Sequence, residues 1–287
     1  MEKYLIAHDL GTSSNKASLF STTGELVKSY TVPYEVHFFQ KNCAQQNPED
    51  WWEAVCTATR KIIEDISPEN VLGISFSSQM QACIAVNENG EALRPAMIWA
   101  DQRAEEQMEQ LVERVGFDRM YELNGHRPSA SYSIEKLMWI RDNEPDIYGK
   151  TYKMMLAKDY IICRLTGRFV TDYSEASGTD AFDLKRLKWS GEILDAAGIS
   201  PEKMPELHAS TDVIGTLLPD AAKALGLTEE TAVVCGGGDG PCSALGAGSI
   251  EEGQMFLSYG TSAWIAGTSD EVFLDKEKTL ICFGHVI

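Results

Sequence analysis

An acidic residue followed by a turn of small residues stands close to the N-terminus. Asp9 ends a strand-like segment, Lys16 begins the return strand, and the turn between them carries Gly11, Thr12 and Ser13. The N–H groups and hydroxyls of such a turn bind phosphate oxygens, while the carboxylate holds Mg²⁺ directly or through water and the lysine adds positive charge. A polar hairpin tip with no ligand would carry the same residue types. The segment is therefore a candidate site for a phosphate and a magnesium ion.

A glycine-rich segment late in the chain is a second candidate. Gly236, Gly237 and Gly238 follow a strand-like run and precede Asp239. Glycines let a ligand approach the backbone closely. Asp239 stands where a strand passes into a helix, so it fits two roles: a helix N-cap, which Asp favours, and a carboxylate that accepts a proton in catalysis.

The Gly-Thr-Ser turn recurs near the other end of the sequence, at Gly260 and Thr261. Two such turns facing one cleft would clamp the phosphate tail of a nucleotide. The sequence contains no GxxxxGK[ST] run, which argues against a P-loop enzyme.

The elements that must position these residues alternate between strands and helices. Strands are predicted at 4–9, 15–21, 26–36, 71–77, 82–86, 95–99 and 231–235. We expect the strands up to residue 99 to form one sheet, covered by a helix that begins at Asn47-Pro48. A mostly helical insertion then runs from residue 101 to about 225. Its helices are predicted at 105–115, 134–143, 157–165 and 190–197. A further helix is predicted at 241–248, followed by a hairpin with strands at 255–258 and 262–266.

Composition excludes several classes of partner. The 287 residues include 25 Lys+Arg and 43 Asp+Glu, and the resulting formal charge of -18 disfavours nucleic acid and anionic lipid. The sequence contains no run of eighteen apolar residues, the length needed to span a membrane. The N-terminus also lacks the charged and then apolar pattern of a signal peptide. Seven scattered cysteines without a CxxC pair indicate reduced packing thiols, as in a cytoplasm.

In their order and spacing these segments resemble the FGGY-type carbohydrate kinases, the family of xylulokinase and glycerol kinase in the actin and hexokinase superfamily. The resemblance runs essentially end to end. It also rests on four further segments: Gln79-Met80-Gln81, 96–103, 158–160 and 174–179. It implies an α/β, RNase H-like sugar-binding lobe, with a mixed sheet flanked by helices and a helical insertion.

The resemblance implies an ATP-dependent phosphorylation of a sugar hydroxyl, most closely that of a ketopentose such as xylulose. Asp239 would be the base and Asp9 would organise Mg²⁺, in keeping with the positioning and charge neutralisation that phosphoryl transfer needs. The expected ATP-phosphate contacts are Gly11, Thr12, Ser13, Lys16, Gly260 and Thr261. The expected sugar contacts are Gln79, Met80, Gln81, Trp99, Asp239 and Gly240.

Two departures from the xylulokinase pattern leave the sugar open. Gln81 stands where a His is usual, and Gly240 stands where an Asn usually follows the base. Both change the hydrogen bonds available to substrate hydroxyls, so another ketose or a polyol is an alternative. The side chain of Trp99 suits two roles equally: stacking on the C–H face of a sugar, and packing in the core or at the rim of the site.

Two other classes of protein compete with the kinase. A non-catalytic sugar-binding module would be expected to lack one of the two acids, yet Asp9 and Asp239 are both present. An actin-like or chaperone ATPase is disfavoured because the segment 79–103 and the segment around Asp239 resemble those of sugar kinases instead.

The resemblance also suggests a domain boundary. Residues 1–253 would form the sugar-binding lobe and residues 254–287 the truncated start of a nucleotide-binding lobe. Such a chain would bind sugar but turn over poorly. Strands without their sheet are marginal in water, so we expect residues 255–287 to be disordered or docked on another copy, as in a homodimer.

Overall fold

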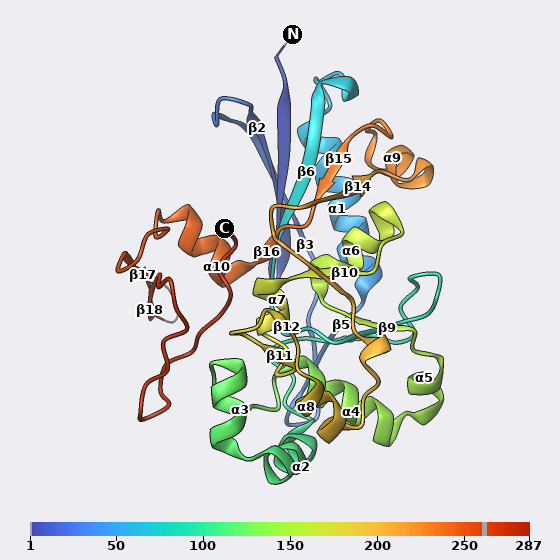
Figure 1. Cartoon of the computed structure of the whole chain (residues 1–287). Coiled ribbons are helices and arrows are strands. Elements are labelled where there is room, and N and C mark those ends of the chain that lie inside the picture. The colour runs from blue at the N-terminus through green and yellow to red at the C-terminus, as the bar shows by residue number, and fades with distance from the viewer. Residues whose placement is uncertain (1, 260–262) are drawn as a thin grey trace.

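The computed structural model describes residues 2–259 and 263–287, and its centre is a mixed β-sheet (Figure 1). Within the described residues this sheet has seven strands in the order β14-β15-β6-β1-β2-β3, with β16 paired to β6. The strands are β1 (Tyr4–Leu10), β2 (Ser14–Ser21), β3 (Leu26–Pro33), β6 (Val71–Ser78), β14 (Val213–Thr216), β15 (Ala232–Val234) and β16 (Gly237–Gly238). β1 runs antiparallel to β2 and parallel to β6, and β16 is also parallel to β6.

Strand β1 shows how the sequence orients this sheet. Side chains alternate between the two faces of a strand, and β1 buries Ile6, His8 and Leu10 while Ala7 and Asp9 are exposed. The alternation therefore places Asp9 on the open face of the sheet, at the end of the strand.

Helix α1 (Pro48–Ile62) covers the opposite face, as its sequence predicts. The side chain of Asn47 caps it by accepting a hydrogen bond from the N–H of Glu49. Trp51, Val55 and Ile62 recur at helical spacing and are fully buried. Burial of this apolar stripe is what holds the helix on the sheet.

Most of the helical insertion lies below the sheet in Figure 1 around its own hydrophobic core, whereas its helix at residues 157–166 packs into the core of the main sheet. Its helices are α2 (Glu105–Val115), α3 (Phe117–Asn124), α4 (Ser133–Asn143), α5 (Pro145–Lys150), α6 (Ala157–Thr166), α7 (Tyr173–Ser177) and α8 (Gly191–Ala197), while α9 (Pro219–Leu225) and α10 (Asp239–Gly246) follow. Short strands connect them: β10 (Val170–Asp172), β11 (Phe182–Asp183), β12 (Lys188–Trp189) and β13 (Glu206–His208). The predicted helices at 105–115, 134–143, 157–165 and 190–197 are confirmed.

The expectation that the strands up to residue 99 form a single sheet is wrong. Strand β7 (Ile84–Val86) pairs with β9 (Lys153–Met155), and β8 (Ala96–Met97) joins β5 (Cys43–Gln46), which also pairs with β4 (His37–Phe39). The chain leaves the main sheet after β6 through Gln81, whose backbone φ is +66°. Beyond this turn β7 therefore pairs with the insertion, and β8 pairs with β5.

The C-terminal part begins with the predicted hairpin, formed by β17 (Met255–Tyr259) and β18 (Ala263–Gly267). The following segment packs on its own chain. The hydroxyl of Tyr121 donates to Asp275 at 2.7 Å, and the N–H of Gly284 donates to Ser177 Oγ at 3.1 Å. Val286 is only 6% exposed. The prediction that this tail is disordered or docked on another copy is therefore wrong for residues 275–286.

Two further observations bear on the sequence analysis. None of the helices in residues 2–259 and 263–287 is long and apolar enough to cross a membrane. All seven cysteines are free thiols, as their scattered spacing predicts.

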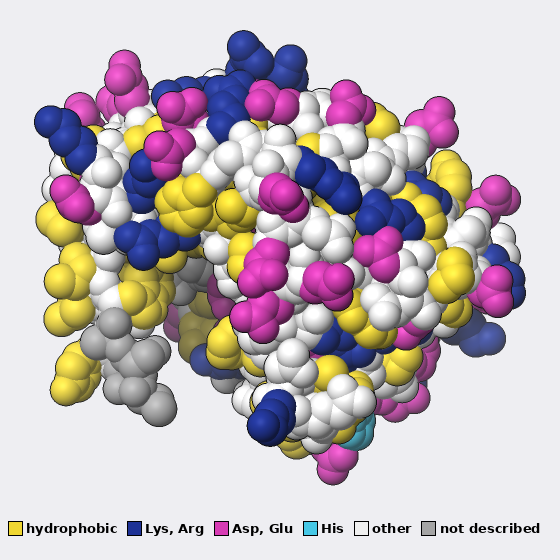
Figure 2. Space-filling view, turned by 90° about the horizontal axis from the view of Figure 1, so that it is seen from below, with side chains coloured by type: hydrophobic (Ala, Val, Ile, Leu, Met, Phe, Trp, Pro, Cys, Tyr) yellow, Lys and Arg dark blue, Asp and Glu magenta, His cyan; other side chains and the backbone are white. Residues whose placement is uncertain are grey.

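Figure 2 shows Asp and Glu side chains interspersed with Lys and Arg on the lower face, which is hollowed between the hairpin side and the rest of the molecule.

Candidate functional site

Asp9 and Asp239 lie at the same edge of the main sheet. Asp9 of β1 is level with Ser77 of β6, and Gly237 of β16 is level with the same Ser77 on its other side. Asp239 directly follows β16. Strand β6 thus separates the two acids by two inter-strand spacings, or about 10 Å between backbones. The carboxyl ends of parallel strands are the usual place for ligands in open α/β sheets.

The charge of Asp9 affects the carboxylate of Asp239. Both residues are exposed, but surrounding protein atoms displace part of their hydration. For Asp239, this burial raises the pKa to about 6, with a further increase from the charge of Asp9, although the N–H of Gly240 opposes it by donating at 2.8 Å. Burial also raises the pKa of Asp9, against the lowering effects of Ser77 and Lys16. An acid with a pKa near 6 is ionised at neutral pH and suits a general base.

Of the two roles that the sequence left open for Asp239, the structure argues against the helix N-cap. The N-cap of α10 is Gly238, and Asp239 is the first residue of the helix, without a side-chain cap bond to it. Its Oδ1 accepts only the adjacent N–H of Gly240 among the described contacts. The carboxylate is therefore available to a ligand.

The turn after β1 is held by donors from neighbouring segments. Tyr34 donates its hydroxyl to the carbonyl of Gly11 at 2.5 Å and its N–H to the carbonyl of Ser13 at 3.1 Å. Gln46 donates to the carbonyl of Thr12 at 2.8 Å. Lys16 lies opposite Asp9 on β2. With its carbonyls occupied, the turn has a fixed shape from which N–H groups and hydroxyls can bind phosphate.

The proposed sugar residues surround the same edge of the sheet, in different states of burial. Trp99 is 47% exposed and donates from Nε1 to Thr12 Oγ1 at 2.9 Å, which joins the sugar segment to the phosphate turn. Met80 is mostly buried against Gly178 and Gly238. Gln79 is buried and donates to the carbonyl of Gly11 at 3.3 Å. Contact between these side chains and a sugar remains a prediction.

Gly260 and Thr261 lie outside the described residues. Their assignment to the ATP phosphates therefore also remains a prediction.

A buried polar network that was not predicted from the sequence supports the glycine loop. Lys158 lies 2.8 Å from Asp159 and 2.9 Å from Asp172. Ser174 donates to Asp172 at 2.5 Å and accepts the N–H of Gly238 at 2.9 Å, one residue before Asp239. Burial lowers the pKa of Lys158, but the two carboxylates outweigh it and raise the pKa well above its usual value. A Lys-Asp pair inside the otherwise apolar run 157–163 was the signal for this network.

The donor chemistry at Asp9 fits Mg²⁺. This ion prefers oxygen ligands and typically takes one or two carboxylates together with phosphate oxygens and water. In the described parts of the chain no group of three or more His, Cys, Asp or Glu could form a metal cage. A single carboxylate beside a phosphate-binding turn is consistent with this mode of binding.

Comparison with known proteins assigns the chain to a family. The sequence model of the N-terminal domain of the FGGY family of carbohydrate kinases matches residues 4–246. The chain belongs to this family. The FGGY-type resemblance and the mixed α/β fold expected from it are thereby confirmed.

The relatives of this FGGY chain include xylulose kinases and gluconokinases. It is 32% identical to xylulose kinase of Staphylococcus xylosus over 99% of its own length and 59% of the relative's. It is 33% identical to gluconokinase of Bacillus subtilis, over 99% and 55% respectively. The crystal structure of ligand-bound xylulose kinase from Lactobacillus acidophilus superposes with a TM-score of 0.93 at 29% identity, covering 98% of this chain and 57% of that one. The chain thus spans somewhat over half the length of these relatives.

Proposed function

We propose that the protein transfers the γ-phosphoryl group of ATP to a hydroxyl of a sugar, with Asp239 as the general base. The observation that carries this proposal is the placement of Asp9 and Asp239 at the ends of β1 and β16, one strand apart, where the charge of Asp9 raises the pKa of Asp239. The names of the relatives, xylulose kinase and gluconokinase, support the same reaction class. Residues 1–253 would form the sugar-binding lobe and residues 254–287 the start of a nucleotide-binding lobe.

The reaction follows from the positions of the two acids. A sugar hydroxyl gives its proton to Asp239 as its oxygen attacks the γ-phosphorus, and the bond from that phosphorus to the bridging oxygen of ADP breaks. Asp9 would hold Mg²⁺, which when bound neutralises phosphate charge. Gly11, Thr12, Ser13 and Lys16 line one side of the phosphates, and Gly260 and Thr261 are proposed for the other.

A ketopentose such as xylulose is the first candidate substrate. Gluconate is the second, because gluconokinase relatives match as well as xylulose kinases do. The residues Gln81 and Gly240 keep another ketose or a polyol in the same test set. A thermal-shift screen with these compounds would rank them, since a ligand that binds only the folded state raises its melting temperature. Binding without turnover would favour a non-catalytic sugar-binding module of the same fold.

The base assignment is tested with Asp239→Asn in the full gene product. Removing a general base is expected to lower kcat by on the order of 10²–10⁴-fold, measured as ADP release and as phosphosugar by mass spectrometry. Asp220→Asn is the matched control, because Asp220 also lies in the first turn of a helix but on α9. Asp220→Asn is expected to keep the wild-type rate. If Asp239→Asn keeps it as well, the role of Asp239 as the base is refuted.

A further inference from the structure

Helix α4 directs two buried polar side chains toward the backbone of the proposed sugar site. Ser133 and Lys136 are three residues apart, so they lie on one face of the helix. Neither side chain is exposed, and their neighbours Ile134, Leu137 and Met138 are also fully buried. A charged group in such an interior is stable only if its donors are satisfied.

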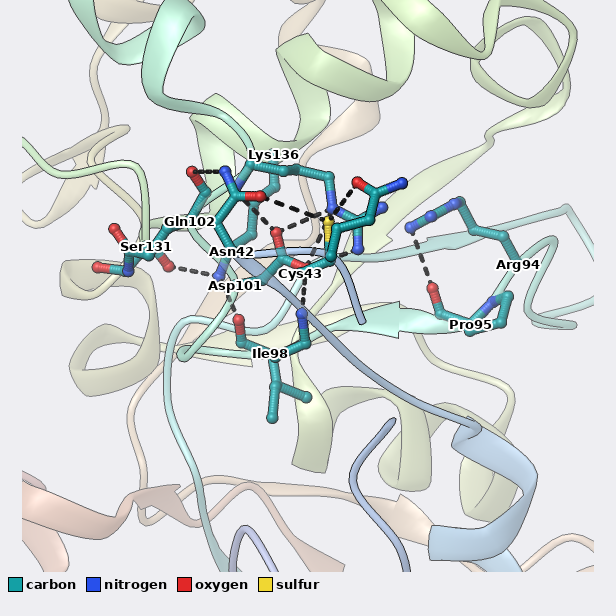
Figure 3. Close-up of polar contacts among 12 residues, drawn as sticks. Asn42, Cys43, Arg94, Pro95, Ile98, Asp101, Gln102, Ser131 and Lys136 are labelled. Atoms are coloured by element: carbon teal, nitrogen blue, oxygen red, sulfur yellow. Dashed lines mark hydrogen bonds and ion pairs between the residues drawn. The ribbon is translucent and has the colours of Figure 1, made fainter. Parts of the chain in front are cut away.

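Lys136 satisfies its donors with three backbone carbonyls from separate segments. Its Nζ lies 2.8 Å from the oxygen of Gln81, 2.7 Å from that of Ile98 and 2.5 Å from that of Ser131. Figure 3 shows Lys136 between Ile98 and Ser131. Three N–H groups are the full capacity of an ammonium. The nearby carboxylate of Asp101 is paired with Arg103 at 2.7 Å. Lys136 therefore works as a backbone anchor.

Two of the anchored carbonyls belong to the sugar-site segments. Gln81 is a proposed sugar contact, and Ile98 directly precedes Trp99. The φ of +66° at Gln81 is a conformation that a non-glycine residue adopts at a cost. Ser133 donates to the next carbonyl, that of Ala82, at 2.9 Å. Two donors from α4 thus hold consecutive peptide groups of this strained turn.

We propose that Lys136, assisted by Ser133, is a positioning residue that orients Gln81 and Trp99 toward the sugar. The inference rests on the proposed function and deepens it, since it concerns the same sugar site. Neither residue touches the sugar in this proposal. They act by fixing the backbone from which Gln81 and Trp99 extend.

The protonation of Lys136 gives the proposal a pH dependence. Burial lowers the pKa of Lys136 to about 8, the nearby Cys83, Asp101 and Glu135 raise it, and Arg103 lowers it. A neutral amine has only two N–H groups, so above pH 8 one of the three carbonyls loses its donor. Sugar affinity is expected to fall between pH 7 and pH 9.

The test is calorimetric titration of the full gene product with D-xylulose and D-gluconate at pH 7 and pH 9. Lys136→Met is expected to raise the sugar Kd by about tenfold or more, and Ser133→Ala to raise it by a smaller factor. In phosphorylation assays the sugar KM should rise more than the KM for MgATP, which Trp99 affects only through its bond to Thr12. Lys203→Met is the matched control, because Lys203 also bridges two carbonyls, those of Tyr148 and Thr151.

The possible outcomes separate the two proposals. Wild-type protein that binds and phosphorylates none of the tested sugars would overturn the proposed function and this inference with it. Normal binding by wild type, with Lys136→Met indistinguishable from Lys203→Met, would overturn the inference alone. If circular dichroism shows that Lys136→Met does not fold, Ser133→Ala and the wild-type pH series decide. A sugar Kd that is unchanged in Ser133→Ala and unchanged between pH 7 and pH 9 in the wild type would then refute the positioning role.

Discussion

His8 links the main sheet to its covering helix through a neutral ring. Its Nδ1 lies 3.1 Å from Asn15 Oδ1 and its Nε2 lies 3.1 Å from Thr59 Oγ1 on α1. Burial lowers the pKa of His8 to about 4, although the bond to Asn15 raises it. The unfolded chain, with a His pKa near 6.5, therefore binds more protons than the folded one between pH 6.5 and pH 4.

The stability from His8 is fully present above pH 6.5 and is lost as the pH falls toward 4. We expect His8 to account for about 2 kcal/mol of the drop in unfolding free energy between pH 7 and pH 5. Urea titrations at both pH values measure this drop. His8→Gln has no titrating ring, so its drop should be smaller by that amount. Equal drops in the two proteins would contradict the assignment.

Asp239 gives the activity a pH dependence of its own. The base must be ionised, and its pKa is about 6. The kcat/KM for the sugar is therefore expected to be level near neutral pH and to fall about tenfold per pH unit well below 6. Rates of phosphosugar formation from pH 5 to 8 test this. A profile that stays flat down to pH 5 would argue against this carboxylate as the base.

At the scale of elements, the glycine loop between β15 and α10 depends on close packing with the sugar segment. A Cβ added at Gly238 would lie 2.7 Å from Cγ and Sδ of Met80. Gly238→Ala is therefore expected to displace Met80, at a cost of about 1–3 kcal/mol in stability. Gly246→Ala in α10 is the control, because a Cβ there meets nothing within 4 Å. Differential scanning calorimetry compares the two; equal melting temperatures would show that Met80 adapts freely.

The same elements show what the sequence could and could not predict. The alternation in β1 and the apolar stripe of α1 are local patterns, so these elements were predictable. The pairing of β7 and β8 outside the main sheet was not predictable from the sequence. It depends on a left-handed backbone conformation at Gln81, and glutamine does not favour that conformation. The candidate acids were found because Asp9 and Asp239 adjoin glycine turns. Lys136 was missed because its function lies in bonds to distant carbonyls.

At the scale of the whole molecule, the C-terminal segment packs against the glycine loop beside the site. A Cβ added at Gly237 would clash with Cγ1 of Val286, so Val286 packs directly on this loop. Phe283 packs against His126, with ring centroids 5.7 Å apart. Contacts between the tail, the insertion and the glycine loop therefore join three parts of the molecule that are distant in sequence.

The loop that anchors this segment allows its docking to be tested. Asp275 accepts hydrogen bonds from the hydroxyl of Tyr121 and from the N–H groups of Thr279 and Leu280. These bonds lower the pKa of Asp275 against the opposing effect of burial. Because the loop is ordered on its own chain, trypsin should cleave slowly after Lys276 and Lys278, at a rate independent of protein concentration. Mass spectrometry of timed digests measures that rate.

Asp275→Ala removes the acceptor for these donors and for the hydroxyl of Thr279, and it is expected to speed cleavage at both lysines. Asp270→Ala, an exposed acid five residues earlier, should digest like wild type. Rapid cleavage of the wild-type tail would mean that it is not held on the insertion. Protection that appears only at concentrations where light scattering detects a dimer would instead place the tail on a second copy. Protection in the monomer, lost in Asp275→Ala alone, is the result that the contacts with Tyr121 require.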